Sequence, residues 1–531
     1  MKKAWKFLGV ALCFIGIFTA TPNADAKRKN EPEKILYIPH DNRPVVVEQT
    51  IDIIERAGYK VIAPPKEILG SREDLGNPDR LWEWLELNTK KDIVAAVISS
   101  DSMLYGSLIS SRLHNYDRQL ILERAELFKD FRNKHKNLPI YVFGSIMRTP
   151  RNGNSSGYEE PDYYRNYGAN IFRYTALIDK WETEGLTPRE NKEIIFLQKL
   201  IPARALEDWQ ERREKNFEAN EKLVDMAGEK IFDCLLLGRD DNAPFSQTHK
   251  EGRNLAKYGE KISGDKYQTI AGIDEIGLIL LTRAINDRTN AQNSVFVSYN
   301  TGAGGNTIPT YSDETIDTSI NAEFLALGVN RVDNVNRADL ILAVNTNPDG
   351  KTFEAISSFN NLRAREGTNF FVNSLQTYLN SGAKVSVADI AFANGADNAL
   401  MEQLKNQKML FKLQSYAGWN TATNSTGFAL STGILARKMT DNDKNNLLVT
   451  RYVDDWAYQS NVRNTVAARL NWIYGAGYYN LLDDKKDDAA EWCEQLLTNF
   501  VRNNLPEVTL KNKMRVQFTW NRMFEAEISF R

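Results

Sequence analysis

Short apolar runs alternate with amphipathic stretches from Ile35 onward, a pattern typical of βαβ units. Several runs are continuously apolar, as expected for parallel strands that helices cover on both faces. We therefore expect an α/β fold with mostly parallel strands. The runs predicted to be strands are Ile35–Pro39, Val61–Pro64, Ile93–Ser99, Ile140–Ser145, Cys234–Leu237, Thr269–Ile273, Val295–Tyr299, Leu340–Val344, Val385–Ala388 and Leu410–Ser415. The stretches predicted to be helices between them are Ile51–Ala57, Leu81–Leu87, Leu120–Arg132, Leu278–Ile285 and Leu400–Leu404.

The spacing of the runs is uneven and suggests how the chain is divided. The long interval between Ile140 and Cys234 has a mostly helical pattern, and beyond Ser415 the pattern is wholly helical. One organisation is two α/β lobes followed by helices, and the alternative is a single elaborated β/α barrel. The predicted divisions are a signal peptide over 1–26, an N-terminal lobe over 35–290 with a helical insertion over 160–225, a second lobe over 291–440 and a helical C-terminal segment over 441–531.

Composition and charge exclude several classes of protein. The 531 residues include 67 Lys+Arg and 69 Asp+Glu, so bulk charge does not favour binding to nucleic acid. Four histidines and three cysteines are too few for us to expect a Cys/His zinc cage. Cys234 lies in a strand-like run and Cys493 in a helical one, so we expect both to be buried and unpaired.

The N-terminus is typical of a secretory signal peptide. Lys2 and Lys3 precede an apolar run from Phe7 to Ala20, and Ala24-Asp25-Ala26 follows as a cleavage site. We expect a secreted or extracytoplasmic protein, with an uncleaved N-terminal anchor or a lipoprotein anchor at Cys13 as alternatives. No later apolar segment is long enough to span a membrane.

Polar residues follow nearly every predicted strand. Because ligands bind at the carboxyl ends of parallel strands, these residues are expected to line one cleft. Each of them also suits a turn or a helix N-cap, which is the alternative interpretation of any single one. Carboxylates, amides, arginines and aromatic rings together suit a polyhydroxylated ligand, so we expect a small molecule or a glycan. The predicted substrate-binding residues are Asp41, Arg43, Asp101, Tyr105, Arg112, Arg148, Asn345, Asp389, Asn394, Trp419, Asn420 and Asp455, with Trp419 as the stacking platform.

Two adjacent acid pairs are the candidates for catalysis. Glycoside hydrolysis uses two carboxyl groups, one as acid and one as base or nucleophile. Asp240 with Asp241, and Asp274 with Glu275, lie at predicted strand ends, and we expect one member of each pair to face the cleft. The sequence thus favours a glycosidic-bond hydrolase that needs no metal and no organic cofactor.

Two alternatives remain open at this point. An extracytoplasmic solute or carbohydrate receptor would have the same lobes and would bind without catalysis. An ester or phosphoester hydrolase would hold Mg²⁺ or Ca²⁺ on Asp240, Asp241 and Asp274. A serine hydrolase is disfavoured because no G-x-S-x-G motif occurs. The sequence does not indicate an oligomeric state.

One further polar cluster lies near the C-terminus. At helical spacing Asp455, Gln459 and Arg463 share a face, which suits either a solvated network or a helix that closes over the cleft and contributes Asp454 or Asp455.

Taken together, these motifs resemble an uncharacterised bacterial family, domain of unknown function 4127. The resemblance spans roughly 35–500, implies one family-wide unit and brings no established activity or catalytic residue. The matching segments are Pro39-His40-Asp41-Asn42-Arg43-Pro44, Tyr105-Gly106, Ser111-Arg112, Asp240-Asp241, Ala271-Gly272-Ile273-Asp274-Glu275, Gly277, Ala388-Asp389-Ile390-Ala391-Phe392-Ala393-Asn394-Gly395-Ala396-Asp397, Tyr416-Ala417-Gly418-Trp419-Asn420-Thr421 and Asp454-Asp455-Trp456-Ala457-Tyr458-Gln459.

Overall fold

A computed structural model describes residues 31–152, 159–476, 481, 483–510 and 512–530. The chain comprises a short unit, Met1–Pro32, and a compact unit, Glu33–Arg531. The predicted signal peptide lies outside the described residues. Within the described part, no helix is both long and apolar enough to cross a membrane.

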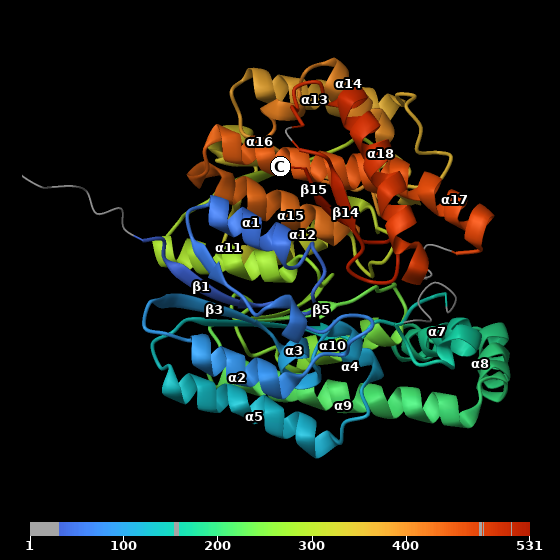
Figure 1. Ribbon diagram of the computed structural model, residues 1–531. Coiled ribbons are helices and arrows are strands. Elements are labelled where there is room, and N and C mark those ends of the chain that lie inside the picture. Colours follow the sequence, from blue (N-terminus) through green and yellow to red (C-terminus); the bar gives the residue numbers. More distant parts are fainter. Residues whose placement is uncertain (1–30, 153–158, 477–480, 482, 511, 531) are drawn as a thin grey trace, which may run out of the picture. The chain divides into compact units, whose positions relative to one another are not determined.

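The first half of the compact unit forms a six-stranded parallel sheet in the order β2-β1-β3-β4-β5-β6 (Figure 1). This arrangement confirms the parallel strands that the continuous apolar runs predicted. Its strands are β1 (Lys34–Ile38), β2 (Lys60–Ile62), β3 (Ile93–Ser99), β4 (Ile140–Ile146), β5 (Cys234–Arg239) and β6 (Tyr267–Ala271).

The second half forms a five-stranded parallel sheet in the order β13-β11-β9-β7-β8. The strands therefore form two separate open sheets and not a closed barrel. The predicted division near residue 290 falls between the last strand of the first sheet and the first strand of the second. The strands are β7 (Ser294–Tyr299), β8 (Asn330–Arg331), β9 (Leu340–Asn345), β11 (Val385–Asp389) and β13 (Ser415–Ala417).

Two strand predictions need correction. Leu410–Lys412 is a 3₁₀ turn, and the strand predicted over Leu410–Ser415 begins only at Ser415. Leu410 and Leu413 are both buried, and their spacing of three matches the three residues per turn of a 3₁₀ helix and not the two-residue repeat of a strand. The C-terminal segment, expected to be wholly helical, ends in an antiparallel hairpin of β14 (Arg515–Gln517) and β15 (Glu527–Ser529). These three-residue strands are too short for periodicity to detect. A small parallel pair, β10 (Phe353–Glu354) and β12 (Phe392–Ala393), was also missed.

The helices form layers on both faces of the sheets. Next to the first sheet, α9 packs on β4 and β5, and α11 packs on β3 and β4. Across the layer boundary α11 contacts α15, which lies on β9, β11 and β13 of the second sheet. The α-helices are α1 (Glu48–Arg56), α2 (Pro78–Asn88), α3 (Ser100–Tyr105), α4 (Leu108–Leu113), α5 (Arg118–Lys134), α7 (Tyr164–Thr183), α8 (Pro188–Leu200), α9 (Ala203–Gly228), α10 (Gln247–Tyr258), α11 (Ile276–Thr289), α12 (Ile316–Leu327), α13 (Glu366–Asn380), α14 (Asn398–Asn406), α15 (Ala422–Leu435), α16 (Asp441–Arg451), α17 (Arg463–Tyr474) and α18 (Lys486–Asn504). The helical insertion predicted over 160–225 contains α7, α8 and most of α9.

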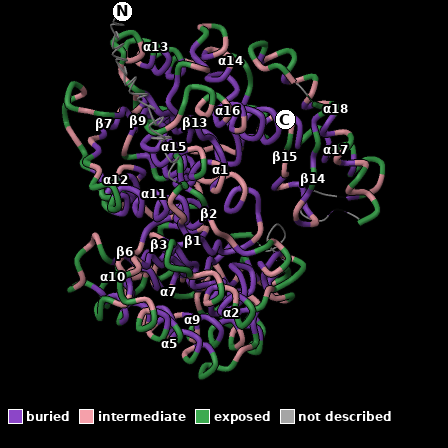
Figure 2. The backbone as a smooth tube through the Cα atoms, turned by 60° about the vertical axis from the view of Figure 1, so that its left-hand side comes forward, coloured by how far each residue is buried: buried purple, intermediate pink, exposed green. Residues whose placement is uncertain are grey.

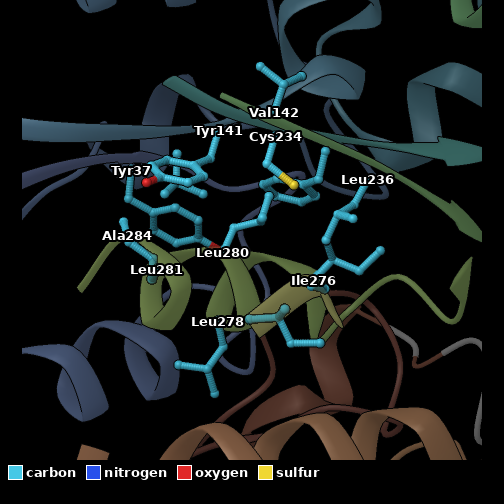
Figure 3. Close-up of a cluster of buried hydrophobic side chains, with 14 of the residues drawn as sticks. Tyr37, Tyr141, Val142, Cys234, Leu236, Ile276, Leu278, Leu280, Leu281 and Ala284 are labelled. Carbon is cyan, nitrogen blue, oxygen red and sulfur yellow. The ribbon is translucent and has the colours of Figure 1, made fainter. Parts of the chain in front are cut away.

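The main core lies between the first sheet and α11. Tyr37 on β1, Tyr141 on β4 and Leu236 on β5 lie on the side of the sheet that faces Ile276 and Leu280 of α11 (Figure 3). Each fully buried side chain of this size contributes roughly 1.5–3 kcal/mol of hydrophobic free energy. Burial follows the same layers in Figure 2, where exposed positions lie along outer helices such as α5. Cys234 and Cys493 are buried and unpaired, as predicted.

The close approach of β5 to the segment after β6 positions the loops discussed below. A Cβ atom on Gly238 would lie 2.3 Å from the Gly272 carbonyl oxygen, so this strand position requires glycine. The backbone cannot move apart freely, because the Gly272 N–H donates to the Arg239 carbonyl at 3.1 Å.

We predict that Gly238→Ala lowers the free energy of unfolding by roughly 1–3 kcal/mol, because the added methyl group overpacks a backbone contact. Chemical denaturation of purified protein measures this change. The matched control is Gly228→Ala at the end of α9, where the nearest atom to the new Cβ is 3.6 Å away. Equal stability of the two variants would contradict the proposed close contact.

Candidate functional site

A cavity of about 550 Å³ lies at the carboxyl edge of the first sheet. The segments after its parallel strands converge there, as the strand-end pattern predicted. The predicted site residues that line the cavity are Arg43 after β1, Arg112 on α4, Arg148 after β4, Asp240 and Asp241 after β5, Asp274 after β6, Asn394 after β12 and Asn420 after β13.

The loop of the C-terminal hairpin, 518–526, supplies a further wall. Trp520, Arg522 and Phe524 line the cavity. The Trp520 ring lies under two guanidinium groups, with the Cζ atoms of Arg43 and Arg522 at 5.2 and 4.6 Å from its centroid. Its Nε1 donates to Asn42 Oδ1 at 2.7 Å. Sequence analysis missed these residues because no local pattern connects the C-terminus with the segment after β1.

Arg43 holds two buried aspartates. It donates to Asp274 Oδ2 at 3.0 Å and Oδ1 at 2.5 Å, and its Nε donates to Asp41 Oδ2 at 2.9 Å. His40 Nε2 lies 3.1 Å from Asp274 Oδ1. Burial alone would raise the pKa of Asp274, but Arg43 and His40 outweigh it and hold that pKa well below its usual range. Asp274 is therefore a fixed anion and a poor proton donor.

A second buried cluster centres on Glu159. Arg112 and Arg148 each donate to its Oε2 at 3.1 Å, and Arg522 of the hairpin contacts its Oε1. Burial opposes ionisation, but Arg522, Arg148 and Arg112 together hold the pKa of Glu159 well below its usual range. Glu159 was not predicted, because it follows no strand directly.

Asp240 and Asp241 both line the cavity, although we expected one member of the pair to face it. The strand ends at Arg239 and Asp241 has φ of 30°, so strand alternation no longer applies. Arg112 Nη2 donates to Asp240 Oδ2 at 2.5 Å, and Arg148 Nη1 donates to Asp241 Oδ2 at 2.9 Å. Burial, and then the charge of Asp240, raise the pKa of Asp241 against the opposing effect of Arg148. The Asp241 side chain is 30% exposed, so it remains accessible.

Glu275 does not line the cavity, in contrast to its neighbour Asp274. It sits at the start of α11 and packs against α15, where a Cβ atom on Gly427 would lie 2.8 Å from the Glu275 Cβ. Burial raises the pKa of Glu275 to about 8, and the charge of Asp274 adds to the effect. Of the pair Asp274 and Glu275, therefore, only Asp274 faces the cavity, as we expected for one member of each pair.

Three other predicted residues of the first half lie outside the cavity lining. Asp41 is buried behind Arg43. Asp101 accepts hydrogen bonds from the Ser145 N–H at 2.9 Å and hydroxyl at 3.0 Å, and burial raises its pKa to about 6. Tyr105 is buried and stacks on His114 with ring centroids 4.8 Å apart. These residues support the loops from behind.

Predicted residues of the second sheet also lie outside the lining. Asn345 donates to Asp389 Oδ1 at 2.9 Å and to Asp397 Oδ2 at 3.2 Å, all within a buried network. Trp419, the predicted stacking platform, is 2% exposed and lies behind Phe524 at 5.5 Å between centroids. The half-buried Phe524 provides the aromatic surface that we had expected from Trp419, whereas Trp520 is 1% exposed and stacks on Arg43 and Arg522.

Asp455, Gln459 and Arg463 are all buried, so they do not form the solvated network that was one of the two interpretations. Tyr452–Val462 is a π-helix, whose wider turn pairs residues five apart, so Gln459 donates to Asp454 Oδ1 at 3.3 Å. Asp455 is buried, bound by Arg451, and accepts the Gly418 N–H at 2.7 Å. Neither Asp454 nor Asp455 lines the cavity.

Apart from the C-terminal hairpin, the second half of the chain lines the cavity with neutral groups and one glutamate. Glu354 on β10 accepts hydrogen bonds from Asn394 Nδ2 at 2.8 Å and from the Tyr311 hydroxyl at 2.9 Å. Asn420 Nδ2 lies 3.5 Å from Asp274 Oδ2 and so connects the two halves of the chain. Sequence analysis placed Asn394 and Asn420 in the site but missed Tyr311 and Glu354.

The proposed metal ligands are not arranged as a metal site. Among the described residues, no group of three or more His, Cys, Asp or Glu side chains is placed to hold a metal ion. Asp240, Asp241 and Asp274 are bound by three different arginines, Arg112, Arg148 and Arg43. This geometry disfavours the Mg²⁺- or Ca²⁺-dependent alternative.

We predict that Glu275 makes stability depend on pH. Its pKa is about 8 in the folded protein, against an ordinary 4.5, so the native state binds the proton more tightly. The tighter proton binding stabilises the folded state. Its contribution to the free energy of unfolding is complete below pH 4.5 and is lost as pH rises through 8, by up to about 1.4 kcal/mol per pH unit. Thermal melts from pH 4 to 9 should show Glu275→Gln gaining stability relative to wild type as pH rises. The exposed control Glu260→Gln should follow wild type, and parallel curves for Glu275→Gln would contradict the prediction.

Comparison with known proteins identifies the family. Residues 35–529 match the family described as Protein of unknown function (DUF4127), which is nearly the whole chain and includes the C-terminal hairpin. No curated protein matches the sequence, so the comparison assigns no activity. The resemblance that the strand-end motifs suggested is confirmed over this range, and the chain belongs to the DUF4127 family of proteins of unknown function.

Proposed function

We propose that this protein is an exported hydrolase that cleaves a glycosidic bond of a carbohydrate in the cavity at the first sheet. The cavity combines the groups that sugars bind to: carboxylates and amides for hydroxyl groups, and the half-buried Phe524 for the apolar face of a ring. Its volume of about 550 Å³ suits one or a few sugar units.

The state of Asp241 is the observation that carries this proposal. A general acid must reach the substrate, and a raised pKa helps it to keep its proton. Asp241 has a raised pKa, lies beside Asp240 and has a side chain 30% exposed. Asp274 is bound too tightly by Arg43 for this role. We therefore assign Asp241 as the acid that protonates the leaving group and Asp240 as a fixed neighbouring charge.

We predict that Asp241→Asn lowers kcat/KM by roughly 10²–10⁴-fold on an aryl glycoside with a poor leaving group. The loss should be much smaller on the corresponding 2,4-dinitrophenyl glycoside, whose leaving group needs no proton. A panel of such glycosides measures both rates. The alkaline limb of the wild-type pH profile should lie above the range of an ordinary aspartic acid and should disappear in the variant.

The control for this experiment is Asp349→Asn, an exposed aspartate outside the cavity lining, which should retain wild-type rates. Equal losses on both leaving groups would show that Asp241 is not the acid. An inactive wild-type protein across the panel would contradict the hydrolase proposal.

Export is the second part of the proposal, and the N-terminal pattern of Lys2, Lys3 and the apolar run to Ala20 supports it. We predict cleavage after Ala26, so that the mature protein begins at Lys27. N-terminal sequencing of the protein from the extracytoplasmic fraction measures this, and Leu12→Arg in the apolar run should block export. A full-length cytoplasmic chain would contradict export, and a membrane-bound full-length chain would support the uncleaved anchor.

A carbohydrate-binding protein without catalysis is the second candidate. The observation that favours it is that arginines neutralise Glu159, Asp240 and Asp274, as in a site built to hold a ligand and not to transfer protons. Saturable binding of a glycan that is recovered unhydrolysed after long incubation would support this candidate over the hydrolase.

A further inference from the structure

We propose that Glu354 is the second catalytic carboxylate, acting as the base that activates water opposite Asp241. This inference rests on the proposed glycoside hydrolysis. No sequence pattern pointed to Glu354, because it belongs to a two-residue strand, Phe353–Glu354, far from the acid pairs in the chain.

Glu354 differs from the other carboxylates that line the cavity. Glu159, Asp240, Asp241 and Asp274 each accept a hydrogen bond from an arginine. The partners of Glu354 are neutral, the Asn394 amide and the Tyr311 hydroxyl, and among the described residues no ion pair joins it to a cationic side chain. Its charge is therefore oriented but not neutralised, which is what a base or a cation-stabilising group requires.

Hydrogen bonds connect the segment of Glu354 with the segment of the acid pair. The Asn242 N–H, directly after Asp241, donates to the Tyr311 carbonyl at 3.0 Å, and the hydroxyl of the same tyrosine donates to Glu354 at 2.9 Å. A second bond, from Thr310 Oγ1 to the Thr352 carbonyl at 3.1 Å, holds the two loops together. Asp241 and Glu354 are thus connected through a tyrosine and do not bind each other.

Water as the nucleophile requires the wider of the two carboxyl spacings that glycosidases use. Inverting glycosidases keep their carboxyl groups about 6.5–9.5 Å apart so that a water fits beside the sugar, whereas retaining enzymes hold them about 5–5.5 Å apart. Tyr311 orients Glu354 through its hydroxyl group and bonds the backbone next to Asp241 through its carbonyl group, so one residue links the segments of the two acids.

The proposed step transfers two protons, breaks one bond between oxygen and the anomeric carbon, and forms another. Asp241 gives its proton to the glycosidic oxygen as the bond from that oxygen to the anomeric carbon breaks, and the electron pair stays on the leaving oxygen. A water oxygen forms the new bond to the anomeric carbon, and Glu354 takes the proton that this water loses. The products are a sugar with a hydroxyl group on its anomeric carbon and a leaving group with a hydroxyl group at the former glycosidic oxygen. Proton exchange with solvent restores both carboxyl groups.

The test compares wild type, Glu354→Gln, Glu354→Ala and the control Glu366→Gln, an exposed glutamate outside the lining, using the full chain and aryl glycosides. We expect Glu354→Gln to lower kcat at least 100-fold and to remove the acidic limb of the pH profile. Sodium azide should restore turnover in Glu354→Ala by forming a glycosyl azide of inverted configuration. Wild-type hydrolysis should also invert the anomeric centre, as followed by NMR.

Wild-type rates in Glu354→Gln, or products of retained configuration, would overturn the role of Glu354 and leave the hydrolase proposal standing. Binding of protonated iminosugars, which mimic the charged transition state, gives a readout that does not need turnover. If wild type hydrolyses no glycoside but binds an iminosugar at least 10-fold more tightly than Glu354→Gln does, the hydrolase proposal fails and Glu354 remains a site for positive charge. If wild type neither hydrolyses glycosides nor binds iminosugars, both proposals are wrong.

Discussion

The buried ion pairs between arginines and carboxylates are the constraint on which the cavity depends. Arg43, Arg148 and Arg522 come from the segments after β1 and β4 and from the C-terminal hairpin, and each holds at least one buried acid. Removing a charge from water costs several kcal/mol unless a partner compensates it, so one lost partner destabilises the others. Glu159 has three arginine partners, one of them on the hairpin. The hairpin is therefore part of the site and not a terminal addition.

The same ion pairs divide the acids of the cavity into two groups. Asp274 and Glu159 are held as anions and position their neighbours, but they exchange protons poorly. Asp241 and Glu354 differ from them, because burial raises the pKa of Asp241 and because the hydrogen-bond partners of Glu354 are neutral. Asp241 follows β5 of the first half and Glu354 lies on β10 of the second half, so both halves of the chain form the cavity.

Much of the fold and part of the site could be predicted from the sequence. Continuous apolar runs such as Ile93–Ser99 predict buried parallel strands, and parallel strands place their following residues at one edge. Arg43, Asp240 and Asp274 were found in this way. The same rule failed for Asn345 and Asp389, since they end strands of the second sheet and pair with each other in its buried edge. A position after a strand predicts that a residue lies at the carboxyl edge of its sheet, but it does not predict whether the cavity lies at that edge.

The sequence by itself determined the alternation of strands and helices, the membership of the family and the polar character of the strand ends, because these follow from local periodicity and residue type. Only the tertiary structure decided which acids are neutralised and which are accessible. Trp520, Glu159 and Glu354 reach the cavity through contacts with residues far away in the chain. Such contacts depend on how layers pack, and the burial that shifts the pKa of Asp241 exists only after those layers have formed.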